Sequence, residues 1–259
     1  MSIDDDKQAI RDKVWRLLEQ EHAAPSGSYG KIPSFEGADR TAALLAELDI
    51  WQRAQTVKAN PDHAQLPVRI RALNDGKLLY MAVPKMASTQ PFYLLDPASL
   101  EVSAEEAADK SGAAKKARRV GASEMRAIDV VICGSVAVNR SGTRIGKGAG
   151  YSDLEVALLI EAGLVTNNTV IVAPVHQLQV IDDEIPQFCR RPRQQRRRQG
   201  RSLWLAGRLT RHRLSSRGVP GQTRPTMCQR LSAKCSMLSA LSTALPGFDL
   251  ASCFPSSRP

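Results

Sequence analysis

The residues of this 259-residue chain that are best suited to chemistry lie in one short run, from Arg144 to Asp153. Three glycines at alternate positions let main-chain N–H groups approach an anion, because glycine has no Cβ to keep it away. Arg144 and Lys147 add positive charge suited to a triphosphate. Asp153 adds a hard oxygen ligand of the kind that magnesium prefers. The run therefore predicts a phosphate site with an associated metal ion.

The elements that must position this run are predicted by its neighbours. Apolar residues at 128–133 predict a buried strand before it, and residues 152–162 predict a helix after it. Strand, glycine loop and helix form the context that a phosphate site needs, because the helix N-terminus adds its dipole and free N–H groups. A plainer explanation stays open for two residues. Asp153 can be a favourable charge in the first helical turn, and Tyr151 can be an ordinary packing residue.

Strands alternate with helices along the first part of the chain, which predicts an α/β fold: a mostly parallel sheet with helices on both faces. Ligands gather at the C-terminal ends of such strands, where the glycine run would lie. Residues 85–121 read as a long polar excursion with one helix near 104–116. The other predicted helices cover 4–21, 41–52 and 66–73, and the other strands cover 56–60, 78–83, 136–138, 169–173 and 178–181.

Composition divides the chain near residue 189. Residues 190–259 hold fourteen Arg and one Lys against a single acid, Asp249, whereas the preceding residues hold slightly more acids than bases. We therefore expect a folded α/β domain at 1–188 and an Arg-, Ser- and Pro-rich tail at 189–259. The tail lacks helix or strand periodicity, so it predicts no folded structure.

Three explanations of the tail stay open. Residues 190–230 could bind nucleic acid or another anionic surface, the tail could be a disordered extension without a role, or it could arise from translation out of frame or through an unremoved intron. We favour the third, because enrichment in Arg, Ser, Pro and Leu is typical of GC-rich DNA read out of frame. The tail also lacks the aromatic-flanked stretch that an RNA-recognition domain needs.

Several other classes are disfavoured. No apolar run reaches the ~18 residues of a membrane span, and the acidic N-terminus lacks the apolar core of a signal peptide, so a cytoplasmic protein is expected. Cys133 reads as a buried small hydrophobe, and the other cysteines lack the spacing of a zinc site. His176 reads as a structural residue, and Trp15 and Trp51 read as core residues.

The chain resembles the 5-formyltetrahydrofolate cyclo-ligases (methenyltetrahydrofolate synthetases) over about residues 5–187. The motifs that carry the resemblance are Lys7-Gln8-Ala9-Ile10-Arg11, the strand at 128–137, and Arg144-Ile145-Gly146-Lys147-Gly148-Ala149-Gly150-Tyr151-Ser152-Asp153. Residues 10–15, 54–62 and 144–148 are closer still to the branch called methenyltetrahydrofolate synthase domain-containing proteins.

The resemblance implies a fold similar to the ribose-5-phosphate isomerase and CoA-transferase group. It also implies ATP- and Mg²⁺-dependent conversion of 5-formyltetrahydrofolate to 5,10-methenyltetrahydrofolate by phosphorylation of the formyl oxygen. ATP and Mg²⁺ are then the cofactors and a reduced folate is the substrate. The alternatives are a catalytically inactive homologue that binds folate or nucleotide, and a nucleic-acid-binding protein that acts through its basic tail.

Site residues also follow from the resemblance. Asp153 would hold magnesium, and the catalytic residues would be Arg144, Lys147 and Tyr151. ATP and the edge of the folate would be contacted by Lys7, Arg11, Gly146, Lys147, Gly148, Gly150 and Tyr151. Without the resemblance, Lys7 and Arg11 could equally be a solvated helix face.

The chain also departs from the family pattern. Ser152 stands where the family has a second tyrosine, and Gly134-Ser135 stands where it has Pro-Gly. No counterpart of the family's last strand is recognisable after Pro186. We therefore expect the sheet to lack that strand and to have an open edge, with poor solubility as the consequence.

Overall fold

The structure is a computed structural model that describes residues 2–84, 88–187 and 201–206. Its centre is a seven-stranded sheet in the order β10-β8-β5-β1-β2-β3-β4. The first five strands of that order pair in parallel, β3 is antiparallel to β2, and β4 is antiparallel to β3, which confirms the predicted mostly parallel sheet. The strands are β1 (Thr56–Ala59), β2 (Leu78–Ala82), β3 (Phe92–Leu95), β4 (Arg118–Val120), β5 (Val130–Ile132), β8 (Val170–Val175) and β10 (Arg201–Ala206).

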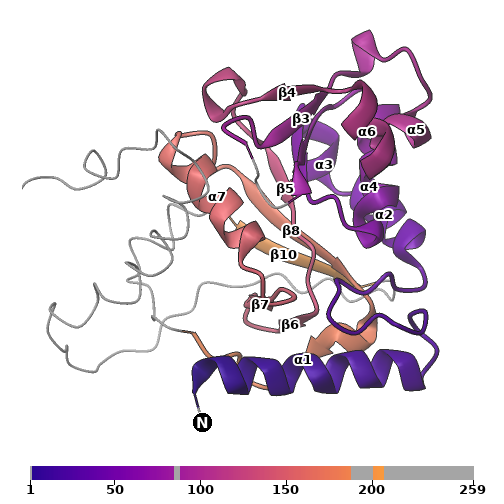
Figure 1. Cartoon of the computed structure of the whole chain (residues 1–259), viewed down its shortest axis with the longest axis vertical. Coiled ribbons are helices and arrows are strands. Elements are labelled where there is room, and N and C mark those ends of the chain that lie inside the picture. The colour runs from indigo at the N-terminus through magenta and orange to yellow at the C-terminus, as the bar shows by residue number, and fades with distance from the viewer. Residues whose placement is uncertain (1, 85–87, 188–200, 207–259) are drawn as a thin grey trace, which may run out of the picture.

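Helices cover both faces of this sheet, as the sequence predicts (Figure 1). Val57 and Ala59 of β1 pack into the core cluster that includes helices α2 and α4, whereas Val131 of β5 packs with Leu159 of α7 on the opposite face. Alternate residues of a strand point to opposite faces, so the two faces of the sheet pack into two separate hydrophobic cores. The helices are α2 (Ala38–Ala46), α3 (Asp49–Arg53), α4 (Leu66–Asn74), α5 (Ala104–Ala108), α6 (Lys110–Lys116) and α7 (Tyr151–Glu161).

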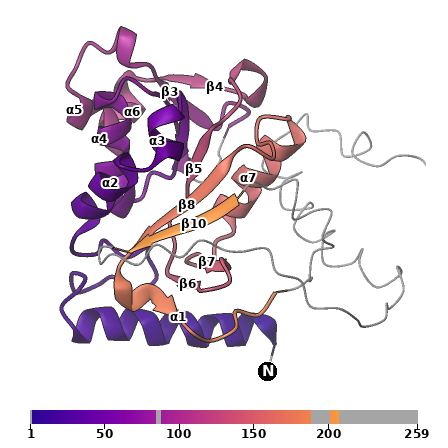
Figure 2. The same ribbon diagram turned by 180° about the vertical axis from the view of Figure 1, so that it is seen from behind.

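A second, three-stranded sheet joins the long N-terminal helix to the glycine run. It has the order β7-β6-β9, and α1 packs against it through Val14, Trp15 and Leu18 (Figures 1 and 2). A capping box between Ser2 and Asp5 begins α1. The bounds are α1 (Ile3–Gln20), β6 (Ala137–Asn139), β7 (Arg144–Ile145) and β9 (Val180–Ile181), with 3-10 helices at His63–Gln65, Pro97–Ser99, Ala122–Glu124 and Gln177–Gln179.

Predictions about individual residues of the core are confirmed. Trp15, Trp51 and Cys133 are all buried. His176 has a structural position, since its Nδ1 accepts a hydrogen bond from the main chain of Leu178 at 3.2 Å. Within the described part of the chain, no helix combines the length and apolar character that crossing a bilayer requires.

The segment from 88 to 121 contains more structure than the single helix that the sequence predicts. Strands β3 and β4 extend the sheet in antiparallel fashion, with Leu94 opposite Arg118. The predicted helix is two helices, because Asp109 has an extended backbone and its side chain caps α6 by accepting from the main-chain N–H groups of Ser111 and Gly112.

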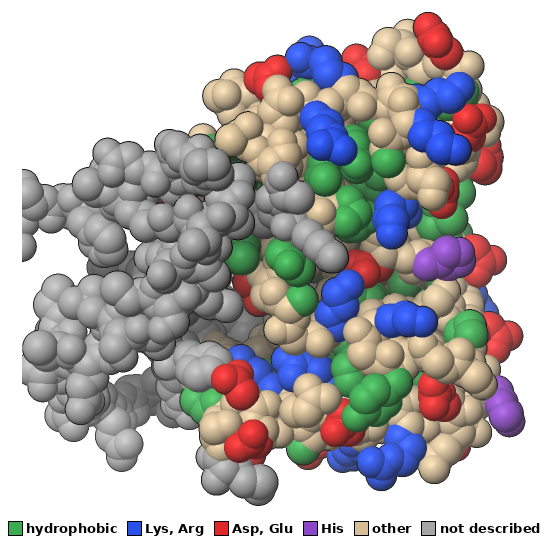
Figure 3. Space-filling view, viewed as in Figure 1, with side chains coloured by type: hydrophobic (Ala, Val, Ile, Leu, Met, Phe, Trp, Pro, Cys, Tyr) green, Lys and Arg blue, Asp and Glu red, His purple; other side chains and the backbone are tan. Residues whose placement is uncertain are grey.

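The expectation that no strand follows Pro186 is wrong. Strand β10 pairs in parallel with β8, from Arg201 opposite Val170 to Ala206 opposite Val175, so it covers the sheet edge that was expected to stay open (Figure 2). Apart from β10, the residues 190–230 that were considered for nucleic-acid binding lie outside the described residues. On the face shown in Figure 3, the basic side chains of the described part are interspersed with acidic ones.

Candidate functional site

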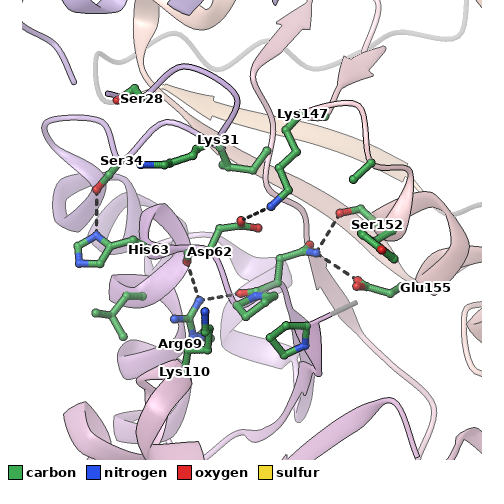
Figure 4. A pocket seen from close by; sticks show the side chains of 18 of the residues that line it. Ser28, Lys31, Ser34, Asp62, His63, Arg69, Lys110, Lys147, Ser152 and Glu155 are labelled. Carbon is green, nitrogen blue, oxygen red and sulfur yellow. Dashed lines mark hydrogen bonds and ion pairs between the residues drawn. The ribbon is translucent and has the colours of Figure 1, made fainter. Parts of the chain in front are cut away.

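A cleft of about 740 Å³ opens where the turn after β1 faces the glycine run (Figure 4). Five segments form its walls: the loop at 25–34, the turn and helix at 60–69, residues 83–84 after β2, the start of α6 at 109–111, and the run at 144–155. The cleft therefore lies beside the C-terminal end of a central parallel strand, which is where the sequence places the site.

The glycine run has the backbone that its composition predicts. Gly148 and Gly150 have φ values of +106° and +71°, in the region that side chains with a Cβ rarely adopt. Gly150 is the residue before α7, and no side chain caps that helix. The first main-chain N–H groups of α7 thus begin at the cleft wall, beside Tyr151, and can serve an anion.

Arg144 and Asp153 form an ion pair at the mouth of the cleft, with Nη2 and Oδ1 2.6 Å apart. The Arg144 side chain is only 18% exposed, whereas that of Asp153 is 79% exposed. Burial lowers the pKa of Arg144, but Cys133, Asp153 and Glu155 raise it by more, so the guanidinium has a pKa above its ordinary value and stays charged. Arg144 can therefore attract an anionic ligand into the cleft.

The donor set around Asp153 decides which kind of metal site is compatible with the cleft. Among the described residues, no group of three or more His, Cys, Asp or Glu side chains could hold a metal ion. Magnesium commonly binds through one or two carboxylates together with the phosphates of its nucleotide. The residues present therefore fit magnesium that arrives with phosphate, with Asp153 as its protein ligand, and they do not fit a metal held by the protein alone.

Lys147 reaches across the cleft to the turn after β1, with Nζ 3.4 Å from Oδ1 of Asp62 (Figure 4). Both side chains line the cleft and both are partly exposed. An anion between them would compete with Asp62 for the ammonium group. The contact therefore places a cation on a flexible side chain in the cleft beside the glycine run.

The predicted N-terminal cations take a different position. Arg11 donates from Nε to the carbonyl oxygen of Gly146 at 2.8 Å, and a Cβ added to Gly148 would lie 3.6 Å from its guanidinium carbon. Arg11 thus holds the backbone of the glycine run on the side away from the cleft. Lys7 lies one turn earlier on α1, partly buried, and neither Lys7, Arg11 nor Gly148 is among the residues that line the cleft. The other predicted site residues, namely Arg144, Gly146, Lys147, Gly150, Tyr151 and Asp153, all line it.

Sequence reasoning missed three residues: Asn60 and Glu155, which line the cleft, and Lys58, which is buried next to Glu155. Lys58 of β1 and Glu155 of α7 form a buried ion pair. Asn60 donates from Nδ2 to Ser152 Oγ at 2.9 Å and to Glu155 Oε2 at 3.1 Å (Figure 4). A lysine inside the apolar strand Thr56–Ala59 was the available signal, because a charge buried in a sheet needs a partner.

Arg69 holds the turn that carries these residues. Its Nη1 donates to the carbonyl oxygens of Asn60 and Asp62 at 2.6 and 2.9 Å, and its Nε donates to that of Ala108 at 2.9 Å. Burial lowers the pKa of Arg69 to about 10, partly offset by Asp62 and Asp109, so it stays charged at neutral pH. Hydrogen bonds from the buried Arg69 side chain therefore fix the backbone that carries Asn60 and Asp62.

Comparisons with known proteins identify relatives of this chain. The model of the 5-formyltetrahydrofolate cyclo-ligase family matches residues 3–188. Methenyltetrahydrofolate synthase domain-containing proteins of Bos taurus and Homo sapiens are 34% and 33% identical over 184 residues, which cover 68% of this chain and 47% of each relative. The chain thus spans about half the length of the curated relatives it matches.

The fold itself is similar to a solved structure, the 5,10-methenyltetrahydrofolate synthetase of Aquifex aeolicus determined by NMR. The TM-score is 0.50 at 16% identity, over 83% of this chain and 96% of that one. At such low identity the likeness concerns the fold alone. The family match, however, covers well over half of the chain and includes every wall of the cleft. The chain belongs to the 5-formyltetrahydrofolate cyclo-ligase family.

Proposed function

We propose that this chain binds Mg-ATP and 5-formyltetrahydrofolate in the cleft and converts the folate to 5,10-methenyltetrahydrofolate. One observation carries the proposal: in a member of this family, Arg144 and Lys147 line a cleft beside a glycine run that leads directly into α7. Cations, main-chain N–H groups and a helix N-terminus together match a transferable phosphate group.

The reaction balances without a covalent intermediate on the protein. The formyl oxygen takes the terminal phosphoryl group of ATP and ADP is released. N10 of the folate then attacks the formyl carbon and loses its proton, and the carbon–oxygen bond breaks to release phosphate. Such a reaction needs positioning and charge stabilisation more than a nucleophile. Magnesium, when bound, would neutralise part of the phosphate charge.

The proposal gives a role to four residues that line the cleft and to Arg11 behind the glycine run. Arg144 and Lys147 would bind phosphate oxygens, and each has a carboxylate partner in the free protein that an anion can replace. Asp153, once separated from Arg144, would face magnesium. Tyr151 is partly exposed at the start of α7 and would border the folate. Arg11 keeps the glycine run in place through Gly146.

The test is turnover of 5-formyltetrahydrofolate followed by the absorbance of the methenyl product, with and without ATP and magnesium. The wild-type chain is expected to form product only when both are present. Lys147→Ala and Arg144→Ala should each raise the KM for ATP about ten- to a hundredfold, since each removes a charge-assisted hydrogen bond.

Lys116→Ala provides the matched control, because Lys116 is an exposed lysine of α6 that does not line the cleft. It is expected to leave the KM for ATP unchanged. A correctly folded wild-type chain that forms no product would contradict the proposal. Equal effects of Lys116→Ala and Lys147→Ala would contradict the assignment of the phosphate site.

Ser152 favours a second candidate function, binding without catalysis. The family pattern has a tyrosine at this position, and here a small side chain accepts a hydrogen bond from Asn60 instead. A site that has lost an aromatic wall can retain its ligand while losing catalytic geometry. Calorimetry distinguishes the two functions: binding of folate and nucleotide together with zero product after long incubation would favour the second.

A further inference from the structure

Helix α1 holds two walls of the cleft by hydrogen bonds that lie one helical turn apart. Arg11 donates from Nε to the carbonyl oxygen of Gly146 in the glycine run, at 2.8 Å. Trp15, four residues later, donates from Nε1 to the carbonyl oxygen of Lys31 in the loop at 25–34, at 2.9 Å. Side chains four residues apart lie on the same face of a helix. One turn of α1 therefore sets the position of the loop relative to the glycine run.

The loop is fastened to α1 at two further points. The main-chain N–H group of Gly27 donates to Glu19 Oε1 at 3.0 Å. The ring of Tyr29 lies against the indole of Trp15, with the ring centroids 4.7 Å apart. The backbone of Lys31 is therefore held in place, whereas its side chain is exposed and lines the cleft.

Each described acid that lines the cleft already has a partner in the free protein. These pairs are Asp62 with Lys147, Asp153 with Arg144, Glu155 with Lys58, and Asp109 with the main-chain N–H groups of Ser111 and Gly112. The ammonium group of Lys31, in contrast, has no ion pair or hydrogen bond within the described part of the chain. Lys31 therefore adds a positive charge to the cleft that no carboxylate in contact with it neutralises.

Lys31 and Lys147 belong to opposite walls of the same part of the cleft. In Figure 4, Lys31 extends from the loop and Lys147 from the glycine run, and both lie on one side of the turn that carries Asp62. Lys110 also lines the cleft without a partner among the described residues, but it lies on the other side of that turn, beside Arg69. An anion between the two walls can therefore contact Lys31 and Lys147 together.

We propose that Lys31 is an anion-binding residue of the cleft and that α1 positions it through Trp15. Its ligand is an anionic oxygen group, either a phosphate of the nucleotide or a carboxylate of the glutamyl part of the folate, because an ammonium group binds both. The inference rests on the proposed function for this choice of ligands. It adds a cation from a loop that is distant in sequence from the glycine run, and a positioning residue that does not line the cleft.

The experiment measures three dissociation constants on the full chain by calorimetry: for inorganic tripolyphosphate, for 5-formyltetrahydrofolate, and for 6-methyltetrahydropterin, which carries no anionic group. Lys31→Ala should raise the Kd for at least one of the two anions about five- to tenfold, the usual effect of losing a charge-assisted hydrogen bond. The Kd for the pterin should stay within about twofold. A loss for tripolyphosphate identifies phosphate as the ligand, and a loss for 5-formyltetrahydrofolate alone identifies the carboxylate.

Two further variants separate charge and positioning from mere structural support. Lys31→Arg keeps the positive charge and should keep the anion Kd within about twofold of the wild-type value. Trp15→Phe keeps an aromatic ring in the core and removes the Nε1 donor, so it should raise the same Kd as Lys31→Ala does and leave that of the pterin unchanged. Combining Trp15→Phe with Lys31→Ala should cause little further loss, because the two residues act as one unit.

Each substitution has a matched control. Lys13→Ala removes an exposed lysine of α1 that does not line the cleft. Trp51→Phe removes the indole donor of another buried tryptophan, whose Nε1 lies 2.7 Å from Asp75 Oδ2 and which does not line the cleft either. Neither control should change any of the three constants. Circular dichroism establishes that each variant is folded.

Three results would overturn the inference. Unchanged Kd values for both anions in Lys31→Ala overturn the anion-binding role. An equal rise of the Kd for the pterin overturns it too, because the loop would then act through its shape and not through its charge. Unchanged anion affinity in a folded Trp15→Phe variant overturns positioning by α1. If Trp15→Phe does not fold, Glu19→Ala, which frees the loop at Gly27, decides that point in the same way.

The outcomes also distinguish this inference from the proposed function. Unchanged anion affinities in Lys31→Ala, with turnover intact in the wild type, overturn the inference and leave the cyclo-ligase proposal standing. A selective loss of anion affinity in Lys31→Ala, in a wild-type background without turnover, supports the inference and contradicts catalysis. A wild-type chain that binds neither anion overturns both.

Discussion

Gly134 shows how a single missing Cβ shapes the cleft. A Cβ added there would lie 3.1 Å from Asp62 Oδ2, 3.1 Å from Ile32 Cγ1 and 3.2 Å from Gln65 Oε1. Those distances are shorter than ordinary van der Waals contact, so the strand end at β5 can approach the turn after β1 only because the residue is glycine. The close approach keeps Asp62 within reach of Lys147.

Gly134→Ala is therefore expected to lower the free energy of unfolding by about 1–3 kcal/mol, the usual cost of overpacking. It should also displace Asp62 from Lys147. Urea denaturation measures the first effect. Gly121→Ala is the control, because a Cβ at that position would meet its nearest neighbour at 3.4 Å, close to ordinary contact. Equal stability of the two variants would contradict the argument.

At the residue scale, the sequence predicted those parts of the site that are contiguous. The cations and glycines of the run from 144 to 153 stand next to one another, so their shared chemistry is visible without a fold. Asn60 and Glu155 are 95 residues apart, and only the pairing of β1 with its neighbours brings them together. The lysine within β1 predicts a buried acidic partner, but nothing in the sequence indicates which Asp or Glu that partner is.

At the scale of elements, the buried Lys58–Glu155 pair joins the central strand β1 to the helix α7 that follows the glycine run. The contact lies within the first turns of α7, so it fixes the start of that helix relative to the sheet. The glycine run is thereby held between two anchors, this pair on one side and the Arg11–Gly146 hydrogen bond on the other.

Replacing only one member of the Lys58–Glu155 pair should lower the free energy of unfolding far more than replacing both members. Lys58→Met leaves the Glu155 carboxylate buried without its partner and is expected to cost about 3–5 kcal/mol in the free energy of unfolding. The double replacement of both residues by Met should restore most of that loss. Unfolding in urea measures both.

The control for this pair is Lys116→Met, which removes an exposed contact with Glu106 and should change stability little. A single Lys58→Met variant as stable as Lys116→Met would contradict the role of the pair. So would a double variant less stable than the single one.

Elements whose signal is local were predicted well, and elements that depend on distant partners were not. The run from Leu66 shows a helical pattern, and α4 forms there. Strand β4 begins with two arginines and is a strand only because it pairs with β3. The four apolar residues of β3 stand between two prolines, which made them resemble a loop.

At the scale of the whole molecule, β10 completes the sheet along β8 over six residue pairs. The residues of β10 follow a strongly basic stretch and show no strand periodicity in their surroundings, so no local pattern predicts a strand there. Its formation depends on the free edge that β8 offers. An edge of that length promotes association between molecules unless it is covered.

Two truncated chains test this role. A chain that stops after residue 187 should expose the edge of β8, lower the midpoint of thermal unfolding and increase light scattering. A chain that stops after residue 206 retains β10 and should behave as the full chain does. Size-exclusion chromatography with light scattering reads out both. Identical behaviour of the two chains would contradict the role of β10.

The position of β1 between β2 and β5 has a consequence for biosynthesis. A ribosome delivers β1 and β2 first, so one edge of β1 stays hydrated until residues 130–132 emerge and pair with it. The cleft takes longer still, because it also requires the run up to Glu155. A nascent chain shorter than that lacks one wall of the cleft, so a ligand of the cleft that is added during translation cannot assist the folding of the earlier segments.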